Sequence, residues 1–267
     1  MKIAVLQLES KLEPEINLKT IRTFLKEAKD NGAEAAFLPE VFYSISNGLK
    51  PTPYLVEDKN EHYQNIQKLA SDFGLYLLGG SVATKVGNKI MNRNYNFDPK
   101  GVELNCYDKT HLFSCDLSRD PSKQIIDEGL IYTAGKDLKT LDLGEFKLGL
   151  SICFDLRFPE MFRHYFKQGC NVMSISAAFT VPTGKAHWHT LLRARAIENQ
   201  SYIIAPAQWG VHNERIKTYG HSLIVDPWGE ILADAGEGEK VIYADLSMEK
   251  LKEVRSRLNV PVEAYLK

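Results

Sequence analysis

Short apolar runs alternate with helix-like stretches along most of the chain, and this alternation constrains the fold more than any other feature. Six runs are strand candidates: Ile3–Leu8, Ala35–Leu38, Leu75–Ser81, Lys147–Cys153, Asn171–Ala177 and Tyr202–Ala207. The spacing of apolar residues predicts helices over Glu15–Asp30, Glu61–Phe73, Arg157–Lys167 and His187–Asn199. Strands that are almost entirely apolar are buried on both faces. The pattern therefore predicts an α/β fold in which helices cover sheets.

Two matching turns indicate that the chain contains two similar halves. Residues 95–104 and 223–232 both have the pattern of a β-hairpin, with Asp-Pro-x-Gly turns that start at Asp98 and Asp226. The turns are 128 positions apart, which is close to half of the 267 residues. Asp-Pro-x-Gly is also a common turn in unrelated proteins, so this match alone leaves the repeat open. No linker rich in Gly, Ser or Pro separates the halves, and one domain over residues 1–267 is expected.

The charge balance excludes several kinds of partner. The chain has 33 Lys and Arg against 34 Asp and Glu, a net charge of −1, so no broad basic surface for nucleic acid or membranes is expected. No apolar run approaches the roughly 20 residues that span a bilayer, and the first residues read as a strand rather than as a signal peptide. A cytoplasmic location is therefore expected. There the four cysteines, which lack CxxC spacing, are free thiols rather than disulfides or a zinc site.

Among the cysteines, Cys153 has the sequence context of a reactive thiol. An apolar strand ends at this residue and a helix-like stretch follows, and open α/β sheets bind ligands at such strand ends. The start of a helix stabilises a thiolate and offers N–H groups to an oxyanion. A lone cysteine is more often a core residue, but polar Asp155 and Arg157 follow here. Cys106 lies in a strand-like stretch, Cys170 reads as packing, and Cys115 lies in a polar loop.

A thiol nucleophile requires a base, and two further residues could complete a site. None of the seven histidines lies in a recognisable Cys/His protease context. Glu40 directly follows a buried strand, where a partly buried carboxylate could act as a general base. Lys109 follows the second strand of the first hairpin, and its charge could stabilise an oxyanion. Taken singly, Glu40 could equally be a solvated loop acid and Lys109 an ordinary surface lysine.

Together, the segments around these three residues resemble the carbon–nitrogen hydrolase (nitrilase) superfamily. The matching segments are Phe37-Leu38-Pro39-Glu40, Tyr107-Asp108-Lys109-Thr110-His111-Leu112-Phe113 and Cys153-Phe154-Asp155-Leu156-Arg157-Phe158-Pro159-Glu160. Their order and spacing match, and the similarity runs from the first strand to about Leu246. The resemblance implies a four-layer αββα sandwich with pseudo-symmetric halves, which agrees with the repeated hairpin.

The resemblance also implies a mechanism. Glu40 takes the proton of Cys153, the thiolate attacks an amide carbonyl, and Lys109 and the backbone N–H of Phe154 hold the oxyanion. Ammonia leaves, and water activated by Glu40 then hydrolyses the thioester. No metal or organic cofactor is implied, and a homodimer is expected.

Many members of the family carry a second active-site glutamate after the lysine segment. Glu128 is the best match. The loop Ser114–Ile131 that contains it departs from the usual pattern, so a solvated loop acid is the alternative.

Two further segments, residues 186–199 and 219–229, resemble the branch that contains deaminated-glutathione amidase and ω-amidase. In that branch an arginine four residues after the nucleophile binds a substrate carboxylate, and Arg157 has this place. Positions i and i+4 share a helix face, and a guanidinium binds a carboxylate through two hydrogen bonds. The alternative is an ion pair with Glu160. The resemblance places Phe179 and Thr183 in the same pocket.

The expected function is hydrolysis of a small carboxylate-bearing amide to an acid and ammonia. Deaminated glutathione is the leading substrate, and 2-oxoglutaramate or 2-oxosuccinamate, another aliphatic amide or an N-carbamoyl compound are alternatives; nitriles are disfavoured. Two hypotheses from other classes are a non-catalytic metabolite-binding protein and a redox sensor that pairs Cys153 with Cys115 or Cys170. Five polar residues are candidates for tuning selectivity: Arg193, Arg195, Glu198, Gln208 and His212.

Overall fold

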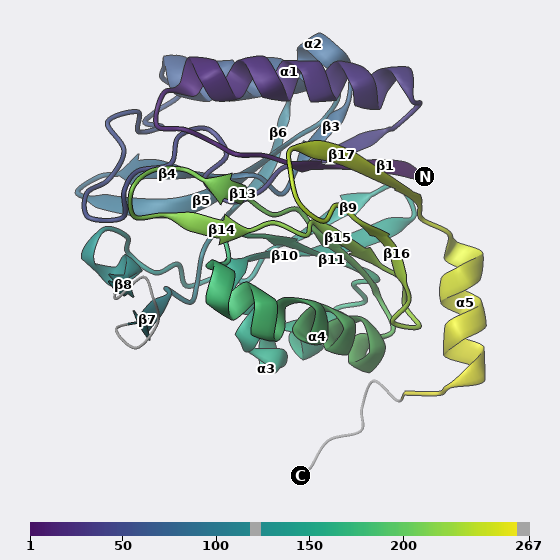
Figure 1. Cartoon of the computed structure of the whole chain (residues 1–267). Helices are drawn as coiled ribbons and strands as arrows, with labels where there is room; N and C mark the ends of the chain where they lie inside the picture. Colours follow the sequence, from purple (N-terminus) through teal and green to yellow (C-terminus); the bar gives the residue numbers. More distant parts are fainter. Residues whose placement is uncertain (118–123, 261–267) are drawn as a thin grey trace.

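The computed structural model describes residues 1–117 and 124–260, and it contains two β-sheets packed face to face (Figure 1). Two helices cover the outer face of each sheet (Figure 1): α1 (Pro14–Asp30) and α2 (Glu61–Phe73) on one side, α3 (Pro159–Lys167) and α4 (Val181–Asn199) on the other. The predicted αββα sandwich is therefore confirmed. A fifth helix, α5 (Met248–Arg257), follows the last strand at one side of the molecule (Figure 1). No helix in the described part of the chain is long and apolar enough to cross a membrane.

The first sheet has seven strands in the order β17-β1-β2-β3-β5-β4, with β6 also paired to β5. Their bounds are β1 (Lys2–Gln7), β2 (Ala35–Phe37), β3 (Tyr76–Leu78), β4 (Ser81–Val86), β5 (Lys89–Phe97), β6 (Glu103–Asp108) and β17 (Lys240–Asp245). The expected strand over Leu75–Ser81 is too long. It ends at Leu78 because Gly79 has a φ of +82°, which turns the chain toward β4.

The second sheet has six strands in the order β16-β15-β12-β11-β10-β9. Their bounds are β9 (Thr140–Leu143), β10 (Phe146–Ile152), β11 (Val172–Ser176), β12 (Tyr202–Ala205), β15 (Leu223–Val225) and β16 (Ile231–Asp234). Two small hairpins lie outside the sheets: β7 (Ser114–Leu117) with β8 (Gln124–Asp127), and β13 (Trp209–Val211) with β14 (Lys217–Tyr219).

The two sheets repeat the same arrangement. In each, three consecutive strands run parallel, β1-β2-β3 and β10-β11-β12, and a hairpin follows antiparallel to the third. The hairpin turns match in detail. The Oδ1 atom of Asp98 accepts the N–H groups of Lys100 and Val102 at 2.8 Å, and that of Asp226 accepts those of Trp228 and Glu230 at 2.9 Å. The expected pseudo-symmetric halves are therefore present.

The start of α3 differs from the sequence prediction. A helix was expected from Arg157, but residues Cys153–Arg157 form a short 3₁₀ helix, η2, and the α-helix starts at Pro159. Phe158 lies between them with φ −107° and ψ 89°, because the ring of a following proline disfavours the helical region. Helix α4 begins at Val181 instead of His187, with Pro182 in its first turn, where a missing N–H costs nothing.

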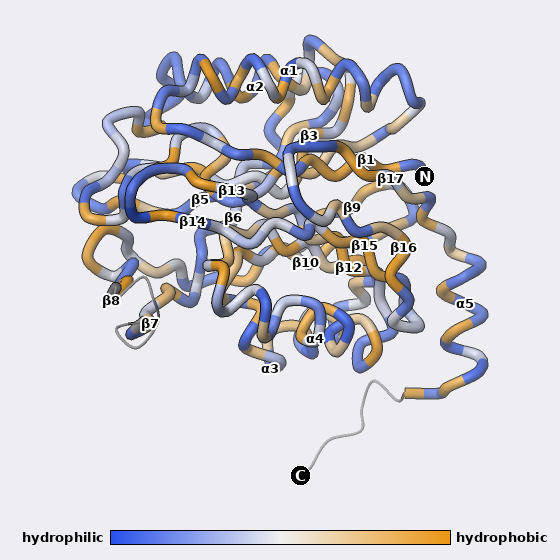
Figure 2. Tube along the Cα trace, in the orientation of Figure 1, coloured by the Kyte–Doolittle hydropathy of each residue, from blue (hydrophilic) through white to orange (hydrophobic). Residues whose placement is uncertain are grey.

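The main hydrophobic core lies between the sheets. Buried side chains from both sheets belong to one cluster, including Val5 and Phe37 of the first and Leu148 and Ile175 of the second. In Figure 2 the strands β12 and β15 are mostly hydrophobic, whereas α1 alternates between hydrophilic and hydrophobic residues, as a surface helix does. Because the two sheets pack against each other, the strand ends of the first half lie beside the strand ends of the second half.

Candidate active site

A cavity of about 620 Å³ opens where β2 and β10 end. Glu40, which follows β2, and Cys153, which follows β10, both line it, and Glu128 of the 3₁₀ helix η1 (Glu128–Leu130) lines it as well. The volume falls within the roughly 300–1,000 Å³ that is usual for pockets that bind small molecules.

Lys109 lies directly behind the two glutamates. Its Nζ atom is 2.9 Å from Oε1 of Glu40 and 2.7 Å from Oε2 of Glu128. Lys109 is completely buried and Glu40 is 2% exposed, so neither is the surface residue that its sequence position alone allowed. The Glu128 side chain is 19% exposed and bound to Lys109, which rules out a solvated loop acid.

The charge states of Lys109, Glu40 and Glu128 depend on one another. Burial alone would lower the pKa of Lys109, but the charges of Glu128 and Glu40 raise it well above its usual value. Burial raises the pKa of Glu128, and the nearby Glu40 charge adds to that effect, while Lys109 opposes it. The lysine therefore stays cationic at neutral pH and holds two carboxylates that would otherwise repel each other.

Further polar groups fix the two glutamates. The Nδ2 atom of Asn92 donates to Oε1 of Glu40 at 2.8 Å, and the backbone N–H of Phe113 donates to Oε2 of Glu128 at 2.8 Å. Sequence reasoning missed Asn92. The available signal was the alternation of Asn92, Asn94 and Asn96 along β5, because buried asparagines on one face of a strand require partners.

Cys153 sits at a sharp turn with a left-handed backbone conformation, φ +50°. Such a conformation costs a non-glycine residue about 1–3 kcal/mol and is concentrated at functional sites. The carboxylate of Asp155 holds the turn in place. It accepts the N–H of Ile152 at 2.8 Å, the hydroxyl of Tyr107 at 2.7 Å and the N–H of His111 at 3.0 Å.

The thiol of Cys153 is buried, and burial raises its pKa well above the usual value. The negative charges of Glu40 and Glu128 act in the same direction, and Lys109 opposes them. The thiol is therefore protonated at neutral pH. Its proton must be removed before the sulfur can attack, which requires a nearby base.

The cavity is also lined by the residues expected to bind substrate, Arg157, Phe179 and Thr183, and by Phe154, whose backbone N–H was expected to hold the oxyanion. Arg157 and Cys153 were expected to share an α-helical face. That reason is wrong, because they are the last and first residues of the 3₁₀ helix η2. Within the described residues no ion pair joins Arg157 to Glu160. The guanidinium lies 5.4 Å from the centre of the Phe179 ring, and its Nη1 is 3.3 Å from Nδ1 of His187.

None of the five residues that were candidates for tuning selectivity lines the cavity. Arg195 donates to the carbonyl of Leu156 and pairs with Glu198, and Arg193 donates to the carbonyl of Gly229. Gln208 donates to the backbone carbonyl of Glu40 at 2.9 Å, so it supports the site indirectly.

The stretch Ser114–Ile131 is not a plain loop. It contains the β7–β8 hairpin and η1, although residues 118–123 lie outside the described part. Cys115 lies in β7, Cys106 in β6, and Cys170 is buried. All four cysteines are free thiols.

Two cations on the cavity wall were missed by sequence reasoning. Arg215 and Lys217 belong to the turn and second strand of the β13–β14 hairpin, and both line the cavity together with Arg157. Their sequence neighbourhood contains no motif, and only the folding of this hairpin over the cavity reveals them.

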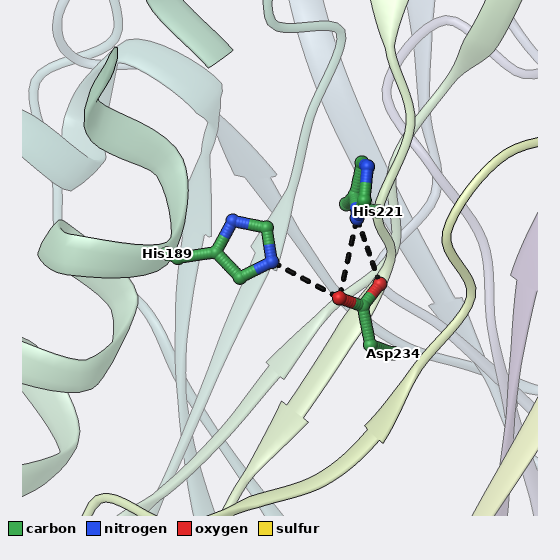
Figure 3. A group of neighbouring side chains, drawn as sticks. All are labelled: His189, His221 and Asp234. Carbon is green, nitrogen blue, oxygen red and sulfur yellow. Dashed lines mark hydrogen bonds and ion pairs between the residues drawn. The ribbon is translucent and has the colours of Figure 1, made fainter. Parts of the chain in front are cut away.

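Outside the cavity, one cluster in the described part of the chain has side chains suited to a metal ion (Figure 3). His189 Nε2 is 3.0 Å from Oδ2 of Asp234, and His221 Nδ1 is 3.0 Å from Oδ1. Burial would raise the pKa of Asp234, but hydrogen bonds from His189, from the N–H of Gly236 and from His221 lower it. None of the three side chains lines the cavity, so the cluster is separate from Cys153.

Comparison with known proteins agrees with this geometry. Residues 2–256 match the family described as carbon–nitrogen hydrolase. The chain is 38% identical to deaminated glutathione amidase of Synechocystis (96% of this chain, 94% of the relative) and 34% identical to omega-amidase NIT2 of Homo sapiens (97% and 93%). Among solved structures, Saccharomyces cerevisiae Nit3, a member of branch 10 of the nitrilase superfamily, superposes with a TM-score of 0.85 at 30% identity (97% of this chain, 94% of that chain).

Proposed function

This chain belongs to the carbon–nitrogen hydrolase family, and on that premise we propose that it hydrolyses the amide bond of a small molecule that carries a carboxylate. The observation that carries this proposal is the contact of buried Lys109 with both Glu40 and Glu128, which line the same cavity as Cys153. An acid and a thiol on the wall of one cavity, with a buried cation bound to the acid, are the groups that thioester chemistry requires.

In the proposed mechanism Glu40 removes the proton of Cys153, and the thiolate attacks the amide carbon. Lys109 and the backbone N–H of Phe154 stabilise the negative charge on the carbonyl oxygen. Glu40 then gives its proton to the leaving nitrogen, and the C–N bond breaks. Water, activated by Glu40, releases the acid from the thioester. Glu128 keeps Lys109 in position through the 2.7 Å contact.

The leading substrate class is an amide of a 2-oxo dicarboxylic acid. This is supported by Arg157 in the cavity wall, whose guanidinium suits a carboxylate, and by relatives named deaminated glutathione amidase and omega-amidase. The leaving group differs between 2-oxoglutaramate, which is a primary amide, and deaminated glutathione. A primary amide releases ammonia, whereas deaminated glutathione releases the amine of a dipeptide, so the expectation that ammonia always leaves is too narrow.

The test uses the product that both substrates share. Incubation with 2-oxoglutaramate and with deaminated glutathione should release 2-oxoglutarate from at least one of them, measured by an enzyme-coupled assay. Butyramide, a neutral primary amide of similar length, is the comparison and should react much more slowly. Rapid hydrolysis of butyramide without release of 2-oxoglutarate from either substrate would contradict the proposal.

Arg157→Lys is expected to raise KM for the acidic amides by roughly 10- to 100-fold, because an ammonium cannot make the paired hydrogen bonds of a guanidinium. The value of kcat should change little, since Arg157 does not touch the reacting atoms in the proposed mechanism. Steady-state kinetics on 2-oxoglutaramate measures both constants, with butyramide as the control. An unchanged KM would show that the carboxylate binds elsewhere.

We also propose that residues 1–267 form one domain, that the protein is cytoplasmic and that it is a homodimer. One shared core between the sheets supports the single domain. Exposed apolar side chains of α4, the β15–β16 turn and β16, namely Ile197, Trp228 and Leu232, support a self-association surface. Sedimentation velocity should give the mass of a dimer for the natural chain and of a monomer for Ile197→Glu. A monomeric natural chain would contradict the dimer.

A further inference from the structure

Three cationic side chains on the cavity wall have no carboxylate partner. Lys109 is neutralised by two glutamates, but across residues 1–117 and 124–260 no ion pair involves Arg157, Arg215 or Lys217, all of which line the cavity. Within the described residues Arg157 contacts the rings of Phe154 and Phe179 and the Nδ1 atom of His187. Unpaired cations around an otherwise largely apolar cavity indicate a ligand with more than one negative charge.

Arg215 is the most informative of the three. Its Nε atom is buried and has no hydrogen-bond partner in the described part of the chain. An unpaired buried donor costs about 1–3 kcal/mol, so such atoms are rare in native proteins and require an explanation. Arg215 also lines the cavity, so a ligand carboxylate that reaches its guanidinium would provide an acceptor that the described residues do not.

The turn that carries Arg215 is held firmly. Oδ1 of Asn213 accepts the backbone N–H groups of Arg215 and Ile216 at 3.0 and 2.9 Å. Beside it, His212 is bonded through Nδ1 to the carbonyl of Ser10 and through Nε2 to Oγ1 of Thr218, both at 2.7 Å. Burial lowers the pKa of His212 to about 4, so the His212 side chain is uncharged at neutral pH. Because the turn is already ordered, little conformational entropy of its backbone is lost when a ligand binds to Arg215 and Lys217.

Besides Glu40 and Glu128, which bind Lys109, two acidic residues line the cavity, Asp127 and Glu214, and neither forms an ion pair with these cations within the described residues. Asp127 uses Oδ1 to accept the N–H of Gly129 at 2.9 Å. Glu214 is exposed, and no ion pair within the described residues joins it to Arg215 or Lys217. The free cations therefore remain available to a ligand.

We propose that Arg215 and Lys217 form a second anion site that receives a carboxylate on the amine side of the substrate. This rests on the proposed function. An amide has an acyl side and an amine side, and Arg157, in the same 3₁₀ helix as Cys153, takes the acyl-side carboxylate. Arg215 and Lys217 come from a different wall, the β13–β14 hairpin. The enzyme therefore prefers amides whose leaving amine is itself an acid, such as a short peptide, over primary amides.

The chemistry of the step is that of the proposed mechanism. The amide C–N bond breaks as the thioester C–S bond forms, and the peptide amine leaves with the proton that Glu40 took from Cys153. The second anion site holds the amine side in the correct orientation until that bond breaks. Arg215 and Lys217 are therefore specificity residues that act on the leaving group.

Three substrates with the same acyl group test this inference: deaminated glutathione, its C-terminal carboxamide, which is the same size but lacks the distal charge, and 2-oxoglutaramate. For the natural chain, kcat/KM should fall by roughly 10- to 100-fold from the acid to the carboxamide, as expected when hydrogen bonds to a charged group are lost. The double variant Arg215→Met/Lys217→Met should lose the same factor on the acid and be unchanged on the other two. Lys185→Met, which removes an exposed cation of α4 outside the cavity wall, is the control and should behave as the natural chain.

The outcomes separate the two proposals. Retained turnover of 2-oxoglutaramate by the double variant shows that the fold and the reacting groups are intact. Equal turnover of the acid and the carboxamide by the natural chain overturns the second anion site and leaves the proposed function standing. An equal loss on all three substrates in the double variant also overturns it. Failure of the natural chain on all three substrates overturns the proposed function and the second site with it.

Discussion

Replacement of Lys109 by methionine is expected to abolish the activity and to lower the free energy of unfolding by about 3–5 kcal/mol near pH 8, the usual cost of removing one partner from a buried ion pair. Methionine fills the space but leaves Glu40 and Glu128 buried without their cation. The oxyanion of the proposed mechanism loses its charged partner as well. Urea unfolding and turnover of 2-oxoglutaramate measure the two effects.

The loss of stability in this variant should depend on pH. The pKa of Glu128 is already raised in the folded protein, and it rises further without Lys109. If the pKa of an acid is higher in the folded state than in the unfolded state, the free energy of unfolding falls as pH rises from the unfolded-state pKa through the folded-state pKa. The free energy of unfolding recovers as pH falls through the same range. The difference between the natural chain and Lys109→Met should therefore be smaller near pH 5.5 than near pH 8.

Lys68→Met provides the matched control, because Lys68 is exposed on α2. It should change stability by less than about 0.5 kcal/mol at either pH, as surface substitutions usually do. A stability loss for Lys109→Met as small as that of the control would contradict the buried charge cluster.

Cys153→Ala is expected to lower kcat by roughly 10⁴- to 10⁶-fold, the range seen when a covalent nucleophile is removed from an enzyme. Stability should change little, because the turn is held by Asp155 through backbone and side-chain contacts that do not involve the sulfur. Residual turnover is measured with a high enzyme concentration over long times, and circular dichroism confirms the fold. Activity close to that of the natural chain would contradict the proposed mechanism.

The covalent intermediate gives an independent measurement. Rapid acid quenching followed by intact mass spectrometry should find the same 2-oxoglutaryl adduct from 2-oxoglutaramate and from deaminated glutathione, and peptide mapping should place it on Cys153. A redox sensor would instead form a disulfide between Cys153 and Cys115 or Cys170 after mild oxidation. An adduct on any other cysteine would contradict the assignment of Cys153.

The parts of the site that could be predicted from sequence are those that follow directly from a strand end. Lys109 and Cys153 come immediately after a strand and Glu40 comes three residues after the end of β2, and hydrophobic patterning is enough to find such ends. Helix α2 was also predicted with its observed bounds. Gly74, with a φ of +61°, ends the helix, and the structure adds that Asn60 caps its start.

Contacts between distant segments could not be predicted in this way. Lys109 contacts Glu128, which directly follows the β7–β8 hairpin, so this contact depends on where the hairpin packs. Arg215 and Lys217 line the cavity only because their hairpin packs beside Ser10 and Ser46 of the other half. The start of α3 was misplaced because the effect of Pro159 on Phe158 outweighs a helical pattern that continues through both residues.

The repeat of two similar sheets has a consequence for how the protein loses activity. Glu40 and Lys109 belong to the first half and Cys153 to the second, so the reacting groups meet only where the halves are pressed together. Neither half carries a complete set of reacting groups. A small shift of one sheet relative to the other would separate Glu40 from Cys153 while both sheets stayed folded. Turnover is therefore a more sensitive measure of the packing between the sheets than a spectroscopic signal from the strands themselves.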